Sequence, residues 1–171
     1  QNVDQQEHPA INLGEGPQRD RDIEGFQTHI RNVAAAGIPC IKYALNLLGA
    51  MRSGTVQGRG DALYTAWKLA DAPKDLPLTR AGVVPGDVFW ERITYFLERV
   101  VPVAAEYKVK LALHPHDPGV PPDGYRGIQR VLGTVEGVKR FITIHENPYH
   151  GLNFCQGTMS EMLQEPGKEI F

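Results

Sequence analysis

The stretch Val109-Lys110-Leu111-Ala112-Leu113-His114 decides the fold class. Successive side chains of a β-strand point to opposite faces, so Leu111 and Leu113 share one face while Ala112 and His114 share the other. Strands of a (β/α)₈ barrel pack apolar side chains outward against helices and carry reactive side chains inward at their carboxyl ends. The alternation therefore favours a barrel over the competing doubly wound open sheet, with His114 at the inward end of its strand.

Helices and strands are expected to alternate on both sides of this strand. The helical segments repeat apolar residues every three or four positions, whereas the strands are short apolar runs. The resulting order is helix, strand, long loop, helix, strand, loop, helix, strand and helix, which predicts a parallel sheet. The expected helices run from Asp20 or Asp22 to Gly37, from Pro85 past Ala104 with a kink at Pro102, from Val135 to His145, and from Met159 into Pro166. The expected strands cover 38–44, 109–114 and 152–155.

Long irregular segments follow the first two expected strands. Residues 49–80 show neither period, and we expect only a short helix at 61–70 within them. The loop from Pro115 to Gly127 is rich in Pro and Gly. Irregular excursions of this length are uncommon unless they serve function, and barrel active sites are built from the loops that follow strands. Both loops are therefore candidates for the walls of an active site.

Composition and length together indicate an incomplete barrel. Hydrophobic residues make up 42% and charged residues 22% of the 171 residues, which is ordinary for a globular domain. A barrel usually needs about 250 residues and at least about 200. We therefore expect a single domain over residues 1–171 that is a partial (β/α)₈ TIM barrel, an internal region lacking the carboxyl-terminal strands. The missing initiator Met agrees with a start further upstream.

Charge and cysteine content exclude several classes of function. The net charge of −2 offers no basic footprint for nucleic acid or anionic lipid. No apolar run is long enough to cross a membrane, and the first four residues lack the features of a secretion signal. Two cysteines are too few for a disulfide scaffold. We expect a cytoplasmic protein with neither nucleic acid nor membrane as partner.

An imidazole and a thiol stand at the ends of two neighbouring expected strands, His114 and Cys155. Adjacent strands lie about 5 Å apart, so both side chains can reach one ion. A His with a Cys thiolate suits Zn, Fe or a similar transition metal rather than Mg or Ca. Two other interpretations stay open from spacing alone: ordinary buried residues, or a Cys–His nucleophilic pair.

The segments around these two residues resemble a known family. The sequence reads His114-Pro115-His116-Asp117-Pro118 and, some forty residues later, Cys155-Gln156-Gly157-Thr158. This pattern is similar to that of the D-mannonate dehydratases, which have a xylose isomerase-like TIM barrel. Weaker matches extend the resemblance from about residue 11 to 163: Gly14–Asp20, Ala36–Pro39 leading into Tyr43, and Gly58-Arg59-Gly60.

The resemblance implies a lyase that removes water from D-mannonate to give 2-keto-3-deoxy-D-gluconate in hexuronate catabolism. It also implies a divalent metal, Mn²⁺ or Fe²⁺ or another divalent ion, held by a His, a Cys, a second His and an Asp. His114 matches the first His and Cys155 the Cys. The partners implied are a small-molecule sugar acid and, for the full-length protein, further copies of itself.

The sequence departs from the family pattern in two places. Many members have Asp where this chain has His116. His116 and Asp117 are both expected beside the metal or the substrate, with Asp117 orienting His114 through its other ring nitrogen. No His or Asp follows Cys155, so the remaining metal ligands and the catalytic acid and base are expected beyond residue 171. The catalytic residues are therefore unknown, and we expect the chain alone to be inactive.

Other polar residues are weaker candidates. Arg59, in the first long loop, is expected either to meet the substrate carboxylate or to be an ordinary exposed arginine. Lys42 is expected on the inward face, in an ion pair or in acid–base work. We expect His145 and His150 to be solvated.

Two alternative functions follow from the same reasoning. A sugar or sugar-phosphate isomerase or epimerase on the same barrel would use the metal to polarise a carbonyl and hydroxyl pair. A non-catalytic metal-binding half-barrel, which assembles with a copy of itself, would need no further ligands from this chain.

Overall fold

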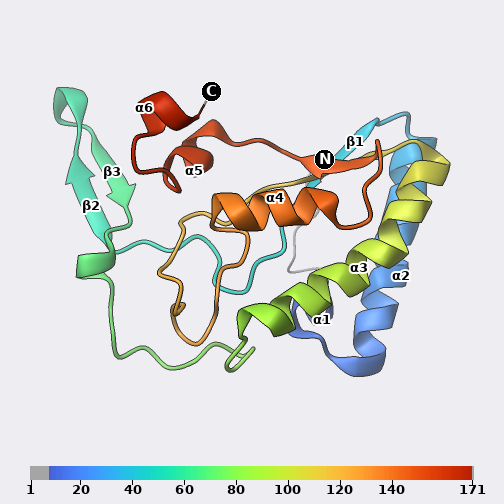
Figure 1. The fold of residues 1–171 in the computed structure, drawn as a ribbon, viewed down its shortest axis with the longest axis horizontal. Helices are drawn as coiled ribbons and strands as arrows, with labels where there is room; N and C mark the ends of the chain where they lie inside the picture. The colour runs from blue at the N-terminus through green and yellow to red at the C-terminus, as the bar shows by residue number, and fades with distance from the viewer. Residues whose placement is uncertain (1–7, 171) are drawn as a thin grey trace.

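Three parallel strands organise the molecule in the order β1–β4–β5 (Figure 1). The computed structural model describes residues 8–170. Its strands are β1 Cys40–Tyr43, β2 Gly54–Gln57, β3 Leu63–Ala66, β4 Lys110–Leu113 and β5 His150–Leu152. Its helices are α1 Pro9–Leu13, α2 Gly16–Ala35, α3 Gly86–Tyr107, α4 Val135–Thr143, α5 Gln156–Ser160 and α6 Pro166–Glu169, with single 3₁₀ turns at Arg59–Asp61 and Leu69–Asp71. Strands β1, β4 and β5 alternate with α2, α3 and α4, which confirms the predicted parallel α/β organisation.

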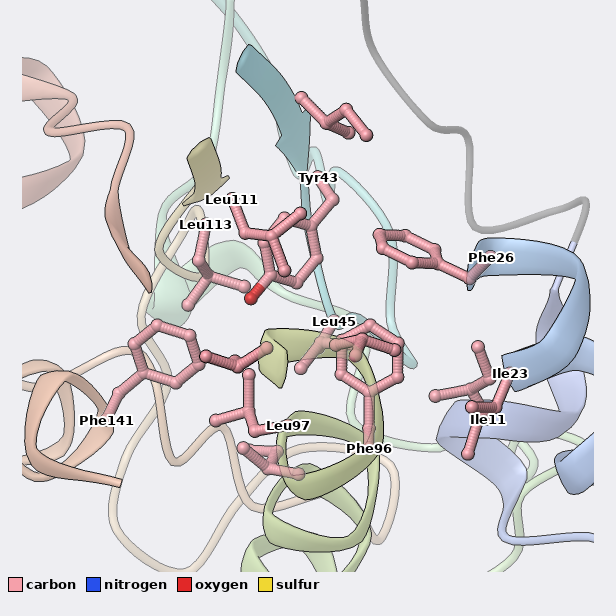
Figure 2. Packing of buried hydrophobic residues seen from close by; sticks show 14 of the residues in the cluster. Ile11, Ile23, Phe26, Tyr43, Leu45, Phe96, Leu97, Leu111, Leu113 and Phe141 are labelled. Carbon is pink, nitrogen blue, oxygen red and sulfur yellow. The ribbon is translucent and has the colours of Figure 1, made fainter. Parts of the chain in front are cut away.

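Helices α2, α3 and α4 cover one face of the parallel sheet. Leu111 and Leu113 of β4 are buried there beside Tyr43 of β1. Figure 2 shows these three side chains pointing toward Phe96 on α3 and Phe141 on α4. Burial of apolar surface in this layer supplies most of the driving force that fixes the three strands.

The opposite face of the sheet carries small and polar side chains. Pairing places Ala112 of β4 between Lys42 of β1 and Gly151 of β5. Lys42 is exposed, and Ala112 and Gly151 are half-buried. The predicted alternation in β4 is confirmed, since Leu111 and Leu113 face the helices and Ala112 faces away. Within residues 8–170 the sheet is open rather than closed, as expected for part of a barrel.

The expected helix at 61–70 is wrong. Residues 54–66 form an antiparallel hairpin in which β2 pairs with β3, and Figure 1 shows it standing apart from the parallel sheet. Gly60 makes the reversal because its φ of 65° is easily reached only by glycine. The run Leu63-Tyr64-Thr65 is rich in residues that favour strands, which explains why pairing wins over a helix.

Two boundaries near the carboxyl terminus also differ from the prediction. The last strand begins at His150 and ends at Leu152, so Cys155 lies beyond it as the N-cap of α5. The predicted helix from Met159 into Pro166 is instead two short helices, and Pro166 opens the second. A proline suits a first helical turn because it has no N–H to leave unpaired there. No helix among residues 8–170 is both long and apolar enough to cross a membrane.

Candidate functional site

The segments after β4 and β5 meet at the carboxyl edge of the sheet. The N–H of His114 donates to the Tyr43 carbonyl at 2.7 Å, and the N–H of Asn153 donates to the Leu113 carbonyl at 2.8 Å. The strand ladders therefore continue one residue past each strand. His114 and Cys155 accordingly follow neighbouring strands at the same sheet edge.

Hydrogen bonding fixes the tautomer of His114. Its Nδ1 lies 2.7 Å from the carbonyl oxygen of Pro115, and a carbonyl can only accept, so Nδ1 carries the proton. In the neutral ring the lone pair is then on Nε2, which is the nitrogen free to bind a metal. The Pro115 carbonyl, rather than the predicted Asp117 carboxylate, thus orients the ring.

The thiol of Cys155 is placed to ionise. The hydroxyl of Thr158 donates to Sγ at 3.3 Å, and this hydrogen bond is the main cause that lowers the pKa of Cys155. The N–H groups of Thr158 and Gly157 lower the pKa further, against partial burial and the charge of Asp117, which raise it. Position at the helix N-cap gives Cys155 these donors. A thiolate is the form that binds metal or acts as a nucleophile.

His116 is a core residue whose ring nitrogens are both occupied. Only 2% of it is exposed, and its ring stacks on Phe89 with centroids 5.6 Å apart. Nε2 donates to the Leu45 carbonyl at 2.6 Å, and Nδ1 accepts from the Leu132 N–H at 3.3 Å. Burial, assisted by the nearby Arg130 charge, lowers the pKa of His116 to about 3. The neutral ring therefore ties the loop after β4 to the loop after β1.

The buried neutral His116 predicts a specific loss of stability in acid. Its pKa is lower in the folded protein than in the unfolded chain, so the unfolded chain binds the proton first as the pH falls below about 6.5. Between about pH 6 and pH 4 the free energy of unfolding should fall by ~1.4 kcal/mol per pH unit from this residue alone. We expect urea unfolding to show this slope in the wild-type protein and its loss in His116→Gln. Parallel pH profiles for the two proteins would contradict the assignment, because other histidines contribute equally to both.

Arg130 is a central residue that sequence reasoning missed. Only 4% of it is exposed, yet its guanidinium donates to the Pro118 carbonyl, to Asn46 Oδ1 at 2.9 Å and to the Gly49 carbonyl at 3.2 Å. Burial lowers its pKa to about 10, although Asp117 and Glu161 favour the charged form. One side chain thus joins the loop after β1 to the loop after β4. The sequence contains one indication that Arg130 is buried. Its neighbours two positions away on either side, Ile128 and Leu132, are apolar, and both are fully buried.

Two clefts meet at Asp117. The smaller, about 210 Å³, is lined by Lys42, Asn46 and His114 among others. The larger, about 870 Å³, lies between the end of the β2–β3 hairpin, the loop after β4 and the segment around Glu161. Asp117 lines both, so the two clefts are neighbours.

The remaining candidates lie elsewhere. Arg59 is exposed in the turn of the β2–β3 hairpin and lines neither cleft. His145 is exposed as expected. His150 is not solvated as predicted: the earlier start of β5 pairs it with Leu111 on the helix-covered face, where Nε2 lies 3.0 Å from the Phe141 carbonyl. Burial lowers its pKa, which disfavours the charged ring.

The donor types at the sheet edge fit a transition-metal ion, but the described part of the chain does not complete a site. His114 offers its Nε2 and Cys155 a thiol whose pKa is lowered, a combination of donors typical of Zn and Fe sites. No group of three or more His, Cys, Asp and Glu side chains in residues 8–170 could hold an ion. These residues therefore supply at most two ligands.

Sequence and structure comparisons identify the family. The model of the D-mannonate dehydratase (UxuA) family matches residues 76–168, more than half of the chain, and spans both His114 and Cys155. The chain belongs to the D-mannonate dehydratase family. A mannonate dehydratase from Shouchella clausii is 31% identical and one from Thermotoga petrophila 30%, each across 89% of this chain and 50% of the relative.

A solved structure agrees with this assignment. The crystal structure of mannonate dehydratase from Streptococcus suis serotype 2 superposes with a TM-score of 0.75 at 29% identity, covering 92% of this chain and 44% of that chain. The resemblance noted in the sequence is thereby confirmed, and so is the fold class. The chain spans about half the length of the curated relatives it matches.

Proposed function

We propose that this chain forms part of the active site of a hydro-lyase that converts D-mannonate to 2-keto-3-deoxy-D-gluconate. The observation that supports the proposal is the position of His114 and Cys155 after neighbouring parallel strands, at one edge of the sheet and inside the region matched by the family model. Membership of the D-mannonate dehydratase family supports the substrate. The large cleft that opens beside this edge gives a small molecule room to bind.

His114 Nε2 and Cys155 Sγ would hold a divalent ion such as Mn²⁺ or Fe²⁺. The proton beside a carboxylate is barely acidic, and a bound ion would supply a Lewis acid that stabilises the negative charge left when that proton is removed. The chain contributes by keeping both donors in their binding forms. The Pro115 carbonyl holds the His114 tautomer, and the Thr158 hydroxyl favours the Cys155 thiolate.

Lys42 is placed to bind the substrate carboxylate. It lies on the open face of β1, is exposed, and lines the same small cleft as His114. An ammonium at this position would attract an anionic substrate and orient its carboxylate toward the sheet edge. Asp117 at the junction of the clefts would accept hydrogen bonds from substrate hydroxyls.

A chimera tests the proposed function. This chain would replace the matching part of Streptococcus suis mannonate dehydratase, and keto-acid formation would be measured with Mn²⁺ or Fe²⁺. We expect a 2-keto-3-deoxy acid from D-mannonate and a much slower reaction with its C2 epimer D-gluconate. The His114→Ala chimera should be inactive, while His145→Ala, a solvated histidine, should match the parent chimera.

Two results would count against the proposal. One is a folded chimera, verified by circular dichroism, that forms no keto acid while the parent enzyme does. The other is keto-acid formation that survives His114→Ala unchanged. Isomerised or epimerised products in place of the keto acid would redirect the assignment to proton transfer without loss of water.

A further inference from the structure

The larger cleft has the composition of a carbohydrate site. We call it the hairpin cleft and define it by Arg52, Thr65, Trp67, Asp117, Glu161 and Gln164. Its volume of about 870 Å³ lies within the range of about 300–1,000 Å³ seen for small-molecule sites. Carboxylate, guanidinium, hydroxyl and amide groups share the wall with one large aromatic ring. This mixture suits a molecule with many hydroxyls and with C–H faces that pack on a ring.

The polar wall of the hairpin cleft is held in place. Arg52 donates from Nε to Thr65 Oγ1 at 3.3 Å and from Nη1 to the Met51 carbonyl at 2.6 Å, which fixes the plane of its guanidinium. Trp67 follows β3 directly and packs edge-on against Tyr125, with centroids 5.3 Å apart. Such preorganisation lowers the entropy lost when a ligand binds.

Charge balance decides which part of a sugar acid the hairpin cleft accepts. Asp117 and Glu161 interact with each other, and Arg52 and Arg130 lie close enough to oppose their charges. The wall itself carries the two carboxylates against the single guanidinium of Arg52, because the buried Arg130 does not line the cleft. The cleft therefore does not favour a carboxylate ligand. Carboxylate oxygens instead accept hydrogen bonds from hydroxyl groups, which are neutral donors.

We propose that the hairpin cleft binds the hydroxylated tail of an open-chain sugar acid, with Trp67 packing on its C–H face and Glu161 accepting its hydroxyls. The inference rests on the proposed function for the position of the reacting end, at His114 and Lys42 in the small cleft. Asp117, which lines both clefts, joins the two regions. Trp67 and Glu161 are thus substrate-binding residues that discriminate between sugar acids by chain length and hydroxyl configuration.

Tryptophan fluorescence provides a direct readout in the 171-residue chain. The chain has two tryptophans, and Trp90 lies apart from the hairpin cleft, 8% exposed beneath the Arg140 guanidinium at 4.2 Å. The Trp90→Phe protein therefore reports on Trp67 alone. We expect a saturable fluorescence change with D-mannonate and also with D-mannitol, which keeps the hydroxylated tail but lacks the carboxylate. Glycolate, a carboxylate without the tail, should cause no change.

Matched substitutions test the two residues. Glu161→Gln should weaken D-mannitol binding about tenfold, the value of one hydrogen bond to a charged acceptor, whereas Glu98→Gln on α3 should leave it unchanged. Trp67→Leu should weaken binding at least as much in calorimetry, and Trp90→Leu should not. The proposal would be overturned if D-mannitol left the fluorescence of Trp67 unchanged, or if Glu161→Gln bound D-mannitol as tightly as the wild type.

The outcome is separable from that of the proposed function. Saturable binding of D-mannitol without keto-acid formation by the chimera would retain the cleft assignment and remove the dehydratase assignment. Keto-acid formation with a KM for D-mannonate that Glu161→Gln and Trp67→Leu leave unchanged would retain the dehydratase assignment and remove the cleft assignment.

Discussion

Replacing Arg130 by methionine is expected to destabilise the protein by about 3–5 kcal/mol, the loss typical when one partner of a buried charged network is removed. Methionine keeps much of the side-chain volume but donates no hydrogen bond. The Pro118 and Gly49 carbonyls and Asn46 Oδ1 would all lose this donor, and Asp117 would lose the favourable charge of Arg130. Because these acceptors belong to two different loops, the loss should fall on the carboxyl edge of the sheet.

Urea unfolding measures the effect, and two further variants control for it. Arg130→Lys keeps the charge but cannot reach three acceptors at once, so its loss should be intermediate. Arg80→Met removes an arginine that forms an ion pair with Glu15, and the two side chains are 71% and 42% exposed. This substitution should lower the free energy of unfolding by less than about 1 kcal/mol. Hydrogen exchange of the 44–50 and 115–120 amides should accelerate in Arg130→Lys. Equal stability of Arg130→Met and Arg80→Met would show that the buried contacts contribute nothing.

The parts of the fold that follow from local periodicity were predictable. Alternation in β4 placed Leu111 and Leu113 against the helices, because each side chain's face depends only on its position in the strand. The same alternation directed His114 to the other face, and the alternating helices put β5 next to β4. Those two facts place His114 and Cys155 after the carboxyl ends of neighbouring strands.

Features that depend on distant partners were not predictable. The β2–β3 hairpin forms because Leu63–Ala66 pairs with Gly54–Gln57. The hydrophobic pattern of either segment alone does not predict that pairing. Arg130 draws its importance from acceptors about 80 residues away in sequence. His116 looked like a substituted active-site residue, yet its contacts with Leu45 and Phe89 make it part of the core. Sequence analysis expected both long loops to line an active site, and the hairpin cleft lies between them, but it did not predict that the segment around Glu161 completes the wall.

Metal binding should depend on His114 and Cys155. It should not depend on Cys40 or His145, which serve as the control cysteine and histidine. Titration of the 171-residue chain with Co²⁺ should produce the sulfur-to-metal absorption that only a coordinated thiolate gives. Cys155→Ser should abolish this absorption, and His114→Ala should weaken Co²⁺ binding by at least about a hundredfold, since even indirect disturbance of ligands costs 10–100-fold. Cys40→Ser, at the amino end of β1, and His145→Ala, in the solvent, should bind like the wild type.

Thr158 should also affect metal binding, because its hydroxyl group donates a hydrogen bond to the thiol of Cys155. Its hydroxyl is the main cause of the lowered pKa of Cys155, so Thr158→Val should raise that pKa while nearly preserving the side-chain shape. Metal competes with protons for the thiolate, and the pH at which Co²⁺ binding is half complete should therefore move upward in Thr158→Val. A Co²⁺ titration unaffected by Cys155→Ser would place the metal elsewhere and remove the role of Thr158 with it. If the pH of half-complete Co²⁺ binding rises in Thr158→Val while the final absorption stays the same, Thr158 acts on the ionisation of the thiol and not on the position of the ligands. Both ligands would then still bind Co²⁺ once the pH is high enough.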